Sequence, residues 1–282
     1  MAPGSSGRSA RVAGLSPFAP YLQSVRRTLI DRRDFLRCGL GMLATPLVGG
    51  APSPPGALGT QNNRLTARPR TPTVTPKPGL TALGLDGDRD GLLYVPTSYT
   101  PDTAVPLFVA LHGAGGKGAS WQSYPDRAEA KGIVLLAPDS RSRTWDAIMA
   151  GTFGPDVRFL DDALRYTFRR CRIDPRRIAL GGFSDGASYA LSLGAANGDL
   201  FSHLVAFSPG FYGPGGRVVG RPRVYVSHGT QDAILPFATT RDRIIPTLRN
   251  AGYDVTFREF DGGHGVPPEI SDGAMVWFTQ GQ

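Results

Sequence analysis

A serine lies between two glycines in the stretch GGFSDGASYALSLG, residues 181–194. Ser184 follows a short apolar run and precedes residues that favour a helix. A Gly-x-Ser-x-Gly sequence between a strand and a helix is typical of a nucleophile elbow, a sharp turn that exposes the serine hydroxyl. A hydroxyl is a weak nucleophile until a base removes its proton. Nucleophilic catalysis by Ser184 therefore requires a histidine and an acid.

Four histidines could supply the base. His203 opens an apolar run and is interpreted as structural. His112, in LHGAGG, and His228, in SHGTQD, directly follow apolar runs and are interpreted as bracing their turns. His264 lies in DGGHGVPP, a loop after the last expected strand, and such a loop can bring an imidazole to a serine held on a rigid turn. We predict that His264 is the general base.

Asp232 is the expected acid, because it follows the strand that ends near His228. The order serine, aspartate, histidine matches that of α/β hydrolases and differs from that of chymotrypsin or subtilisin. Asp254 and Asp261 are nearer to His264 in sequence, but they lie on or beside its own strand. An aspartate in this role fixes the tautomer of the imidazole and stabilises the imidazolium formed during attack.

Two backbone amides are expected to bind the oxyanion of the tetrahedral intermediate. One belongs to Asp185, which follows the nucleophile; its side chain is expected to point away from the base. The other is assigned to Ala114 in the glycine-rich turn after His112, with Gly115 in reserve. This chemistry requires neither a metal nor an organic cofactor.

Short apolar runs alternate with helical patterns from residue 80 onward. This predicts an α/β fold with a mostly parallel sheet covered by helices on both faces, and active sites in such folds lie at the carboxyl ends of the strands. No gap between strands would house a large cap domain. The expected strands are 80–85, 91–95, 106–111, 133–137, 177–181, 203–207, 223–227 and 254–260, and the expected helices are 118–131, 156–171, 186–197, 239–251 and 268–279.

The long loop 139–155 follows a predicted strand and contains aromatic and apolar residues, so we expect it to line an acyl pocket. The candidate pocket residues are Trp145, Met149 and Phe153, with Trp121 and Phe211 as weaker candidates. Ordinary packing is the alternative for each of them.

The sequence DGDRDG at 86–91 matches the first half of a calcium-binding loop. The position for the bidentate glutamate is Thr97, and apolar runs flank the segment closely. It is therefore interpreted as a hairpin turn.

The formal net charge of +8 first suggests a nucleic-acid partner. Residues 1–79 hold eleven basic and two acidic residues, whereas residues 80–282 hold twenty basic and twenty-one acidic ones. The basic character belongs to the N-terminal segment, so the sequence argues against nucleic acid as a partner. It leaves the oligomeric state open.

The N-terminal segment begins with an expected export signal, residues 1–51. Arg32 and Arg33 precede a mildly apolar run, 39–51, as in twin-arginine signals; the run is too short for a stable membrane span. Residues 52–79 are rich in proline and are expected to form a disordered linker. The catalytic domain is expected at 80–282, in an exported protein that is periplasmic or extracellular.

The segments VALHGAGG, LLAPDSR, GGFSDGASYAL, SHGTQD and FDGGHGVPP, in this order, resemble the phospholipase/carboxylesterase family of α/β hydrolases. Poly(3-hydroxybutyrate) depolymerase and feruloyl esterase-like families share much of this pattern. The resemblance implies a serine esterase that acts on small acyl or aryl esters, with Ser184, Asp232 and His264 as its triad. A serine peptidase or amidase, and a non-catalytic envelope binding protein with a relict triad, are the alternatives.

Overall fold

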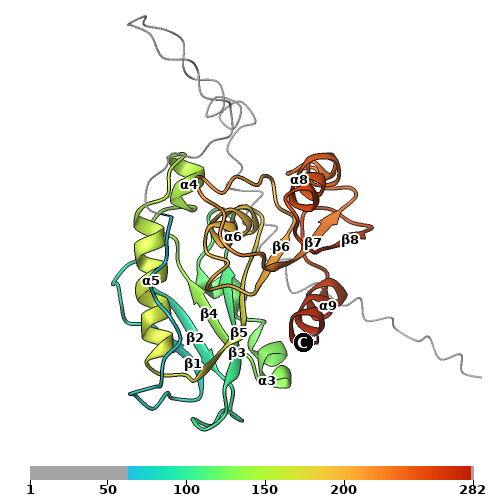
Figure 1. Cartoon of the computed structure of the whole chain (residues 1–282). Coiled ribbons are helices and arrows are strands. Elements are labelled where there is room, and N and C mark those ends of the chain that lie inside the picture. The colour runs from blue at the N-terminus through green and yellow to red at the C-terminus, as the bar shows by residue number, and fades with distance from the viewer. Residues whose placement is uncertain (1–62, 281–282) are drawn as a thin grey trace, which may run out of the picture. The chain divides into compact units, whose positions relative to one another are not determined.

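The computed structural model describes residues 63–280 and contains, within that range, one eight-stranded sheet (Figure 1). The strand order is β1-β2-β4-β3-β5-β6-β7-β8. The strands β3 to β8 run parallel to one another, whereas β1 and β2 are antiparallel to their neighbours. The predicted, mostly parallel sheet is confirmed. The strands are β1 (Gly79–Ala82), β2 (Gly91–Val95), β3 (Val105–Leu111), β4 (Val134–Pro138), β5 (Ile173–Phe183), β6 (His203–Phe207), β7 (Arg223–Gly229) and β8 (Val255–Phe260).

Helices cover both faces of this sheet because successive side chains of each strand point to opposite faces. Along β3, Leu107, Val109 and Leu111 belong to one apolar core, and Phe108 and Ala110 belong to the other. Burying a side chain of this size contributes about 1.5–3 kcal/mol. The first core includes residues of α5 (Pro155–Phe168), α6 (Asp185–Ala196) and α8 (Ile245–Asn250), and the second includes residues of α3 (Pro125–Lys131) and α9 (Pro268–Thr279).

Three helical segments differ from the sequence prediction. The expected helix 118–131 is divided into η1 (Gly118–Trp121) and α3, because Pro125 suits the first position of a new helix. The expected helix 239–251 becomes α7 (Phe237–Thr239), the π-helical η2 (Thr240–Ile244) and α8. Pro246 has no N–H to donate to the helical ladder there. The short α4 (Asp146–Met149) was not predicted, because four residues are too few to show a period.

The prediction of a disordered linker up to residue 79 is wrong for residues 63–79, which we call the strap. Leu65 is buried, and its N–H donates to Asn197 Oδ1 at 2.8 Å. The backbone N–H groups of Thr66 and Ala67 both donate to Asp161 Oδ1 at 2.7 Å. Side chains of α5 and of the residue after α6 thus satisfy the backbone of the strap and offset the cost of ordering it. The export signal and the rest of the linker lie outside the described residues.

The carboxyl ends of the parallel strands meet at one edge of the sheet. The strands β3, β5, β7 and β8 end at Leu111, Phe183, Gly229 and Phe260. The loops that follow these strands hold the candidate catalytic residues.

Candidate active site

Ser184 occupies a strained turn between β5 and α6. Its backbone has φ 58° and ψ −119°, a conformation that residues other than glycine rarely adopt. The Ser184 N–H donates to Phe207 O at 2.9 Å, and the Ser184 carbonyl accepts from the N–H groups of Ala187 and Ser188 in the first turn of α6. A Cβ on Gly182 would lie 2.4 Å from the Gly186 carbonyl. The sequence therefore folds into the elbow expected from its glycines.

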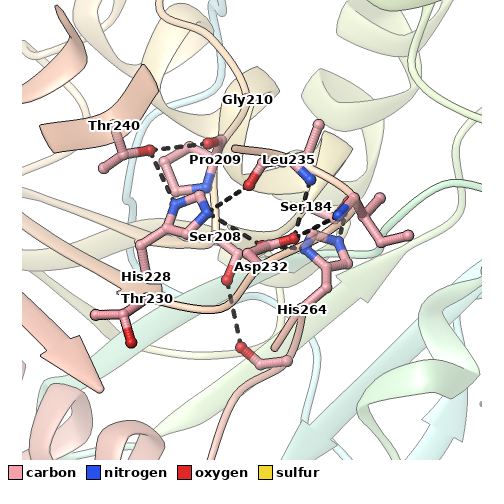
Figure 2. A network of polar contacts seen from close by, with 12 residues as sticks. Ser184, Ser208, Pro209, Gly210, His228, Thr230, Asp232, Leu235, Thr240 and His264 are labelled. Atoms are coloured by element: carbon pink, nitrogen blue, oxygen red, sulfur yellow. Dashed lines mark hydrogen bonds and ion pairs between the residues drawn. The ribbon is translucent and has the colours of Figure 1, made fainter. Parts of the chain in front are cut away.

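A line of hydrogen bonds joins three side chains that are far apart in sequence (Figure 2). His264 Nε2 lies 2.9 Å from Ser184 Oγ, and His264 Nδ1 lies 2.6 Å from Asp232 Oδ2. A carboxylate accepts, so Nδ1 donates its hydrogen to Asp232 and the lone pair of Nε2 faces the serine hydroxyl. This arrangement can remove a proton from Ser184.

The Asp232 carboxylate is anchored by groups other than His264. Its Oδ1 accepts from the N–H groups of Ile234 and Leu235 at 2.8 and 2.9 Å, and its Oδ2 lies 3.1 Å from His228 Nε2. Burial alone would raise the pKa of Asp232, but the hydrogen bonds from His228 and His264 hold it well below its ordinary value. The carboxylate is therefore ionised at neutral pH and can stabilise a positive charge on His264.

Asp254 and Asp261, the other acids near His264 in sequence, make different contacts. Asp254 pairs with Arg223, and Asp261 accepts a hydrogen bond from Gln231 at 2.6 Å. Of the acids compared in the sequence, the structure brings Asp232 to His264.

The turn after β3 is braced by His112, as the sequence predicted. Its Nδ1 donates to Gly113 O at 2.7 Å, and its Nε2 accepts from the Ser140 N–H at 3.0 Å. Burial lowers the pKa of His112 to about 4, so the ring remains neutral and keeps these opposite roles near pH 7. The indole of Trp145 donates to His112 O at 2.9 Å. The position of this turn is thus fixed from two sides.

The two amides predicted to form the oxyanion hole belong to residues beside this turn and the Ser184 turn. Asp185 is the first residue of α6, where an N–H has no acceptor within its own helix. Gly113 packs against the elbow, since a Cβ on it would lie 3.3 Å from Ser184 Cβ. Next to it, the Ala114 N–H makes no hydrogen bond within residues 63–280, whereas the Gly115 N–H donates to Arg143 O at 2.7 Å. The contacts favour Ala114 over Gly115.

The Asp185 side chain turns to Thr144, whose hydroxyl donates to Asp185 Oδ2 at 2.6 Å. Burial raises the pKa of this carboxyl. The sequence held no signal for Thr144.

The structure does not place most of the predicted pocket residues in a pocket. Trp145 is fully buried between the rings of His112 and Tyr189, and Phe153 is fully buried against Tyr189. Trp121 is buried against Tyr124. These aromatic side chains pack against other rings and support the fold.

Met149, on α4, is 60% exposed, and Phe211 is half-buried in the loop after β6. The backbone of the loop 139–155 is tied by two carboxylates, the buried Asp156 and the half-buried Asp146. Asp156 accepts from Asp146 N at 2.5 Å, and Asp146 accepts from Gly154 N at 2.9 Å. The aromatic and apolar residues of this loop had suggested contact with substrate.

The segment DGDRDG forms the hairpin turn between β1 and β2 that the sequence predicted. Asp90 accepts from the N–H groups of Gly84 and Leu85 at 2.7 and 2.9 Å. Arg89 donates to Gly116 O at 2.8 Å and so connects the turn to the residues after β3. Within residues 63–280, no group of three or more His, Cys, Asp or Glu side chains is arranged to hold a metal ion.

No family model matches the sequence. Feruloyl esterase B of Thermothelomyces thermophilus is 30% identical over 125 residues, which cover 41% of this chain and 42% of that protein. The chain spans less than half the length of the curated relatives it matches.

Solved structures show the same architecture. Esterase PE8 matches with a TM-score of 0.56 and 22% identity, over 68% of this chain and 98% of that structure. An acetyl xylan esterase from Aspergillus awamori matches with a TM-score of 0.57 and 18% identity, over 71% of this chain and 98% of that structure. At this level of identity the likeness concerns the fold. The chain therefore has the α/β-hydrolase fold, and the relative and the two solved structures named above are esterases.

Proposed function

We propose that the chain is an exported serine carboxylic-ester hydrolase that acts on short acyl or aryl esters. The observation that supports this most directly is the hydrogen-bonded line from Ser184 Oγ through His264 to Asp232, with distances of 2.9 and 2.6 Å. These three residues act as nucleophile, general base and orienting acid.

The reaction proceeds through an acyl-enzyme. Ser184 Oγ attacks the ester carbonyl while His264 Nε2 takes the hydroxyl proton, and Asp232 stabilises the imidazolium. The amides of Asp185 and Ala114 donate to the oxyanion of the tetrahedral intermediate. His264 then protonates the leaving alcohol. Water, activated by the same imidazole, attacks the acyl-enzyme and releases the acid.

Small substrates are favoured by the connections between the strands. The stretch between β4 and β5 holds α4 and α5, and the stretch between β7 and β8 holds α7, η2 and α8. Helices α5 and α8 contribute to the apolar core that covers the sheet. Neither stretch adds a separate domain over the strand ends in the described part of the chain. Relatives named feruloyl esterase and acetylxylan esterase suggest aromatic and acetyl esters as first substrates.

Export rests on the twin arginines Arg32 and Arg33 and on the apolar run that follows them. Among the described residues, no helix is long and apolar enough to cross a bilayer. Replacing both arginines by lysine should keep the protein in the cytoplasmic fraction, whereas the unaltered chain should be recovered outside the inner membrane. Equal distribution of the two forms would contradict export by this route.

Two measurements test the activity. A fluorophosphonate probe should label the protein, and Ser184→Ala should abolish both labelling and ester turnover. Turnover of 4-nitrophenyl acetate, butyrate and a feruloyl ester should greatly exceed that of matched anilides. Faster anilide cleavage would indicate an amidase or peptidase instead, and an absence of labelling would indicate a binding protein.

A further inference from the structure

A second histidine contacts the Asp232 carboxylate, at the same oxygen as the proposed general base. His228 is fully buried, and its Nε2 lies 3.1 Å from Asp232 Oδ2 and 2.9 Å from Leu235 O (Figure 2). Both oxygens are acceptors, so His228 Nε2 carries a hydrogen. Asp232 Oδ2 is the same oxygen that accepts from His264 Nδ1 at 2.6 Å. The one hydrogen on His228 Nε2 is shared between the nearer Leu235 O and Asp232 Oδ2, so the oxygen that accepts from His264 is also in close polar contact with His228.

The other nitrogen of His228 is held by a hydroxyl. His228 Nδ1 lies 2.9 Å from Thr240 Oγ1, which lies 3.0 Å from Pro209 O. The hydroxyl has one hydrogen. If it donates to Nδ1, His228 is neutral, and if it donates to Pro209 O, Nδ1 donates to the hydroxyl and His228 is an imidazolium. In both arrangements Nε2 keeps its hydrogen, so its contacts with Leu235 O and Asp232 Oδ2 do not depend on which state is occupied.

We propose that His228 is a positioning residue that acts on the base His264 through Asp232. This inference rests on the proposed function. The N–H of His228 draws electron density from Asp232 Oδ2 and so limits how strongly the carboxylate attracts the proton on His264 Nδ1. It also fixes the carboxylate in the orientation that aligns His264 with Ser184. His228 thereby tunes the basicity of the imidazole that removes the serine proton.

The charged groups around this network are few in the part of the chain described. Asp232 is the charged neighbour of His228, whose remaining contacts are Leu235 O, the Thr240 hydroxyl and the edge-on ring of Phe237. His264 faces the carboxylates of Asp232 and Asp185 and the ring of Phe183. A change at His228 therefore reaches His264 through Asp232.

The test compares His228→Met, which fills similar space without a donor, with His228→Gln, which can place an N–H near the position of Nε2. His228→Met should lower kcat about tenfold with little change in KM, because the base is misaligned after binding. It should also raise the acidic pKa of the kcat/KM profile by about half a unit, since the carboxylate then holds the imidazolium more strongly. His228→Gln should recover much of both effects.

A proton NMR measurement on the resting protein complements the kinetics. The far-downfield resonance of the His264 Nδ1 proton should move further downfield in His228→Met and return toward its original position in His228→Gln. This measurement requires no turnover, so it tests His228 even if the protein hydrolyses no ester. Failure of the proposed function would appear separately, as absent labelling of the unaltered chain.

His203→Met is the matched control, because His203 is also buried but contacts Ser202 and aromatic rings of α9 instead of the Asp232 network. It should lower thermal stability and leave the pH profile and the downfield resonance in place. If His228→Met behaves in the same way, or if His228→Gln recovers neither effect, then His228 has only a structural role and the proposal is wrong.

Discussion

Gly186 lies so close to β3 that a Cβ on it would come within 2.3 Å of the Leu111 carbonyl oxygen. The first turn of α6 therefore rests directly on the end of the strand that precedes His112. This contact holds the turn at Ser184 and the turn after β3 at a fixed separation.

Gly186→Ala should reduce both stability and probe labelling. The added methyl group meets backbone, which cannot rotate away as a side chain can, so a loss of about 1–3 kcal/mol in the free energy of unfolding is expected. Urea unfolding and the rate of fluorophosphonate labelling measure the two effects. Gly87→Ala is the control, because no atom lies within 4 Å of the added Cβ there. Unchanged labelling in Gly186→Ala would show that the two turns do not depend on this contact.

Asp232→Asn should lower kcat by about 10³–10⁴-fold while the protein remains folded. The asparagine oxygen can still accept from the Ile234 and Leu235 amides, but its NH₂ group then faces His264 Nδ1. The imidazole must then accept at Nδ1, and its Nε2 carries a hydrogen toward Ser184. Steady-state kinetics on a 4-nitrophenyl ester measure the loss. Asp261→Asn should retain full activity, and a comparable loss in that variant would assign the acid differently.

Trp145→Phe should destabilise the protein by about 1–3 kcal/mol and lower kcat more than it raises KM. The substitution removes the donor to His112 O and part of the packing against Tyr189. The turn that holds Ala114 loses a support, whereas no contact with an acyl group is lost. Thermal unfolding and kinetics on acetate and butyrate esters check this. Met149→Ala, at an exposed site, should leave stability unchanged. If Trp145→Phe causes only a large rise in KM, Trp145 contacts the acyl group after all.

As the pH falls, the His203→Met variant should lose less stability than the unaltered chain does. Burial lowers the pKa of His203 from 6.5 to about 4, so the folded chain stays neutral there while the unfolded chain binds a proton. The contribution of His203 is therefore complete above pH 6.5 and is lost as the pH falls toward 4. Methionine does not titrate. Urea unfolding at pH 7.5, 6, 5 and 4 should show the gap between the two proteins narrowing, and a constant gap would contradict the lowered pKa.

The sheet was predictable because its strands are apolar runs bounded by turn residues, and this pattern is visible in one sequence. The chain order of Ser184, Asp232 and His264 was similarly informative, because the fold brings successive strand ends together. The division of a helix near Pro246 was not predicted, since helical periodicity continues across it. The buried position of Trp145 was not predictable either. An aromatic residue in a polar loop has the same sequence signature whether it faces substrate or a buried ring such as Tyr189.

The strap limits the distance that the chain before residue 63 can place between itself and the sheet. A fully extended chain spans at most about 3.3–3.6 Å per residue. Residues 63–79 lie on the domain itself, because Leu65 is buried and the amides of Thr66 and Ala67 are bound to Asp161. Their length therefore adds nothing to the distance that a preceding linker can span. A protein truncated at residue 80 would expose the apolar site of Leu65 to water. Expression beginning upstream of Asn63 should therefore give the more soluble protein.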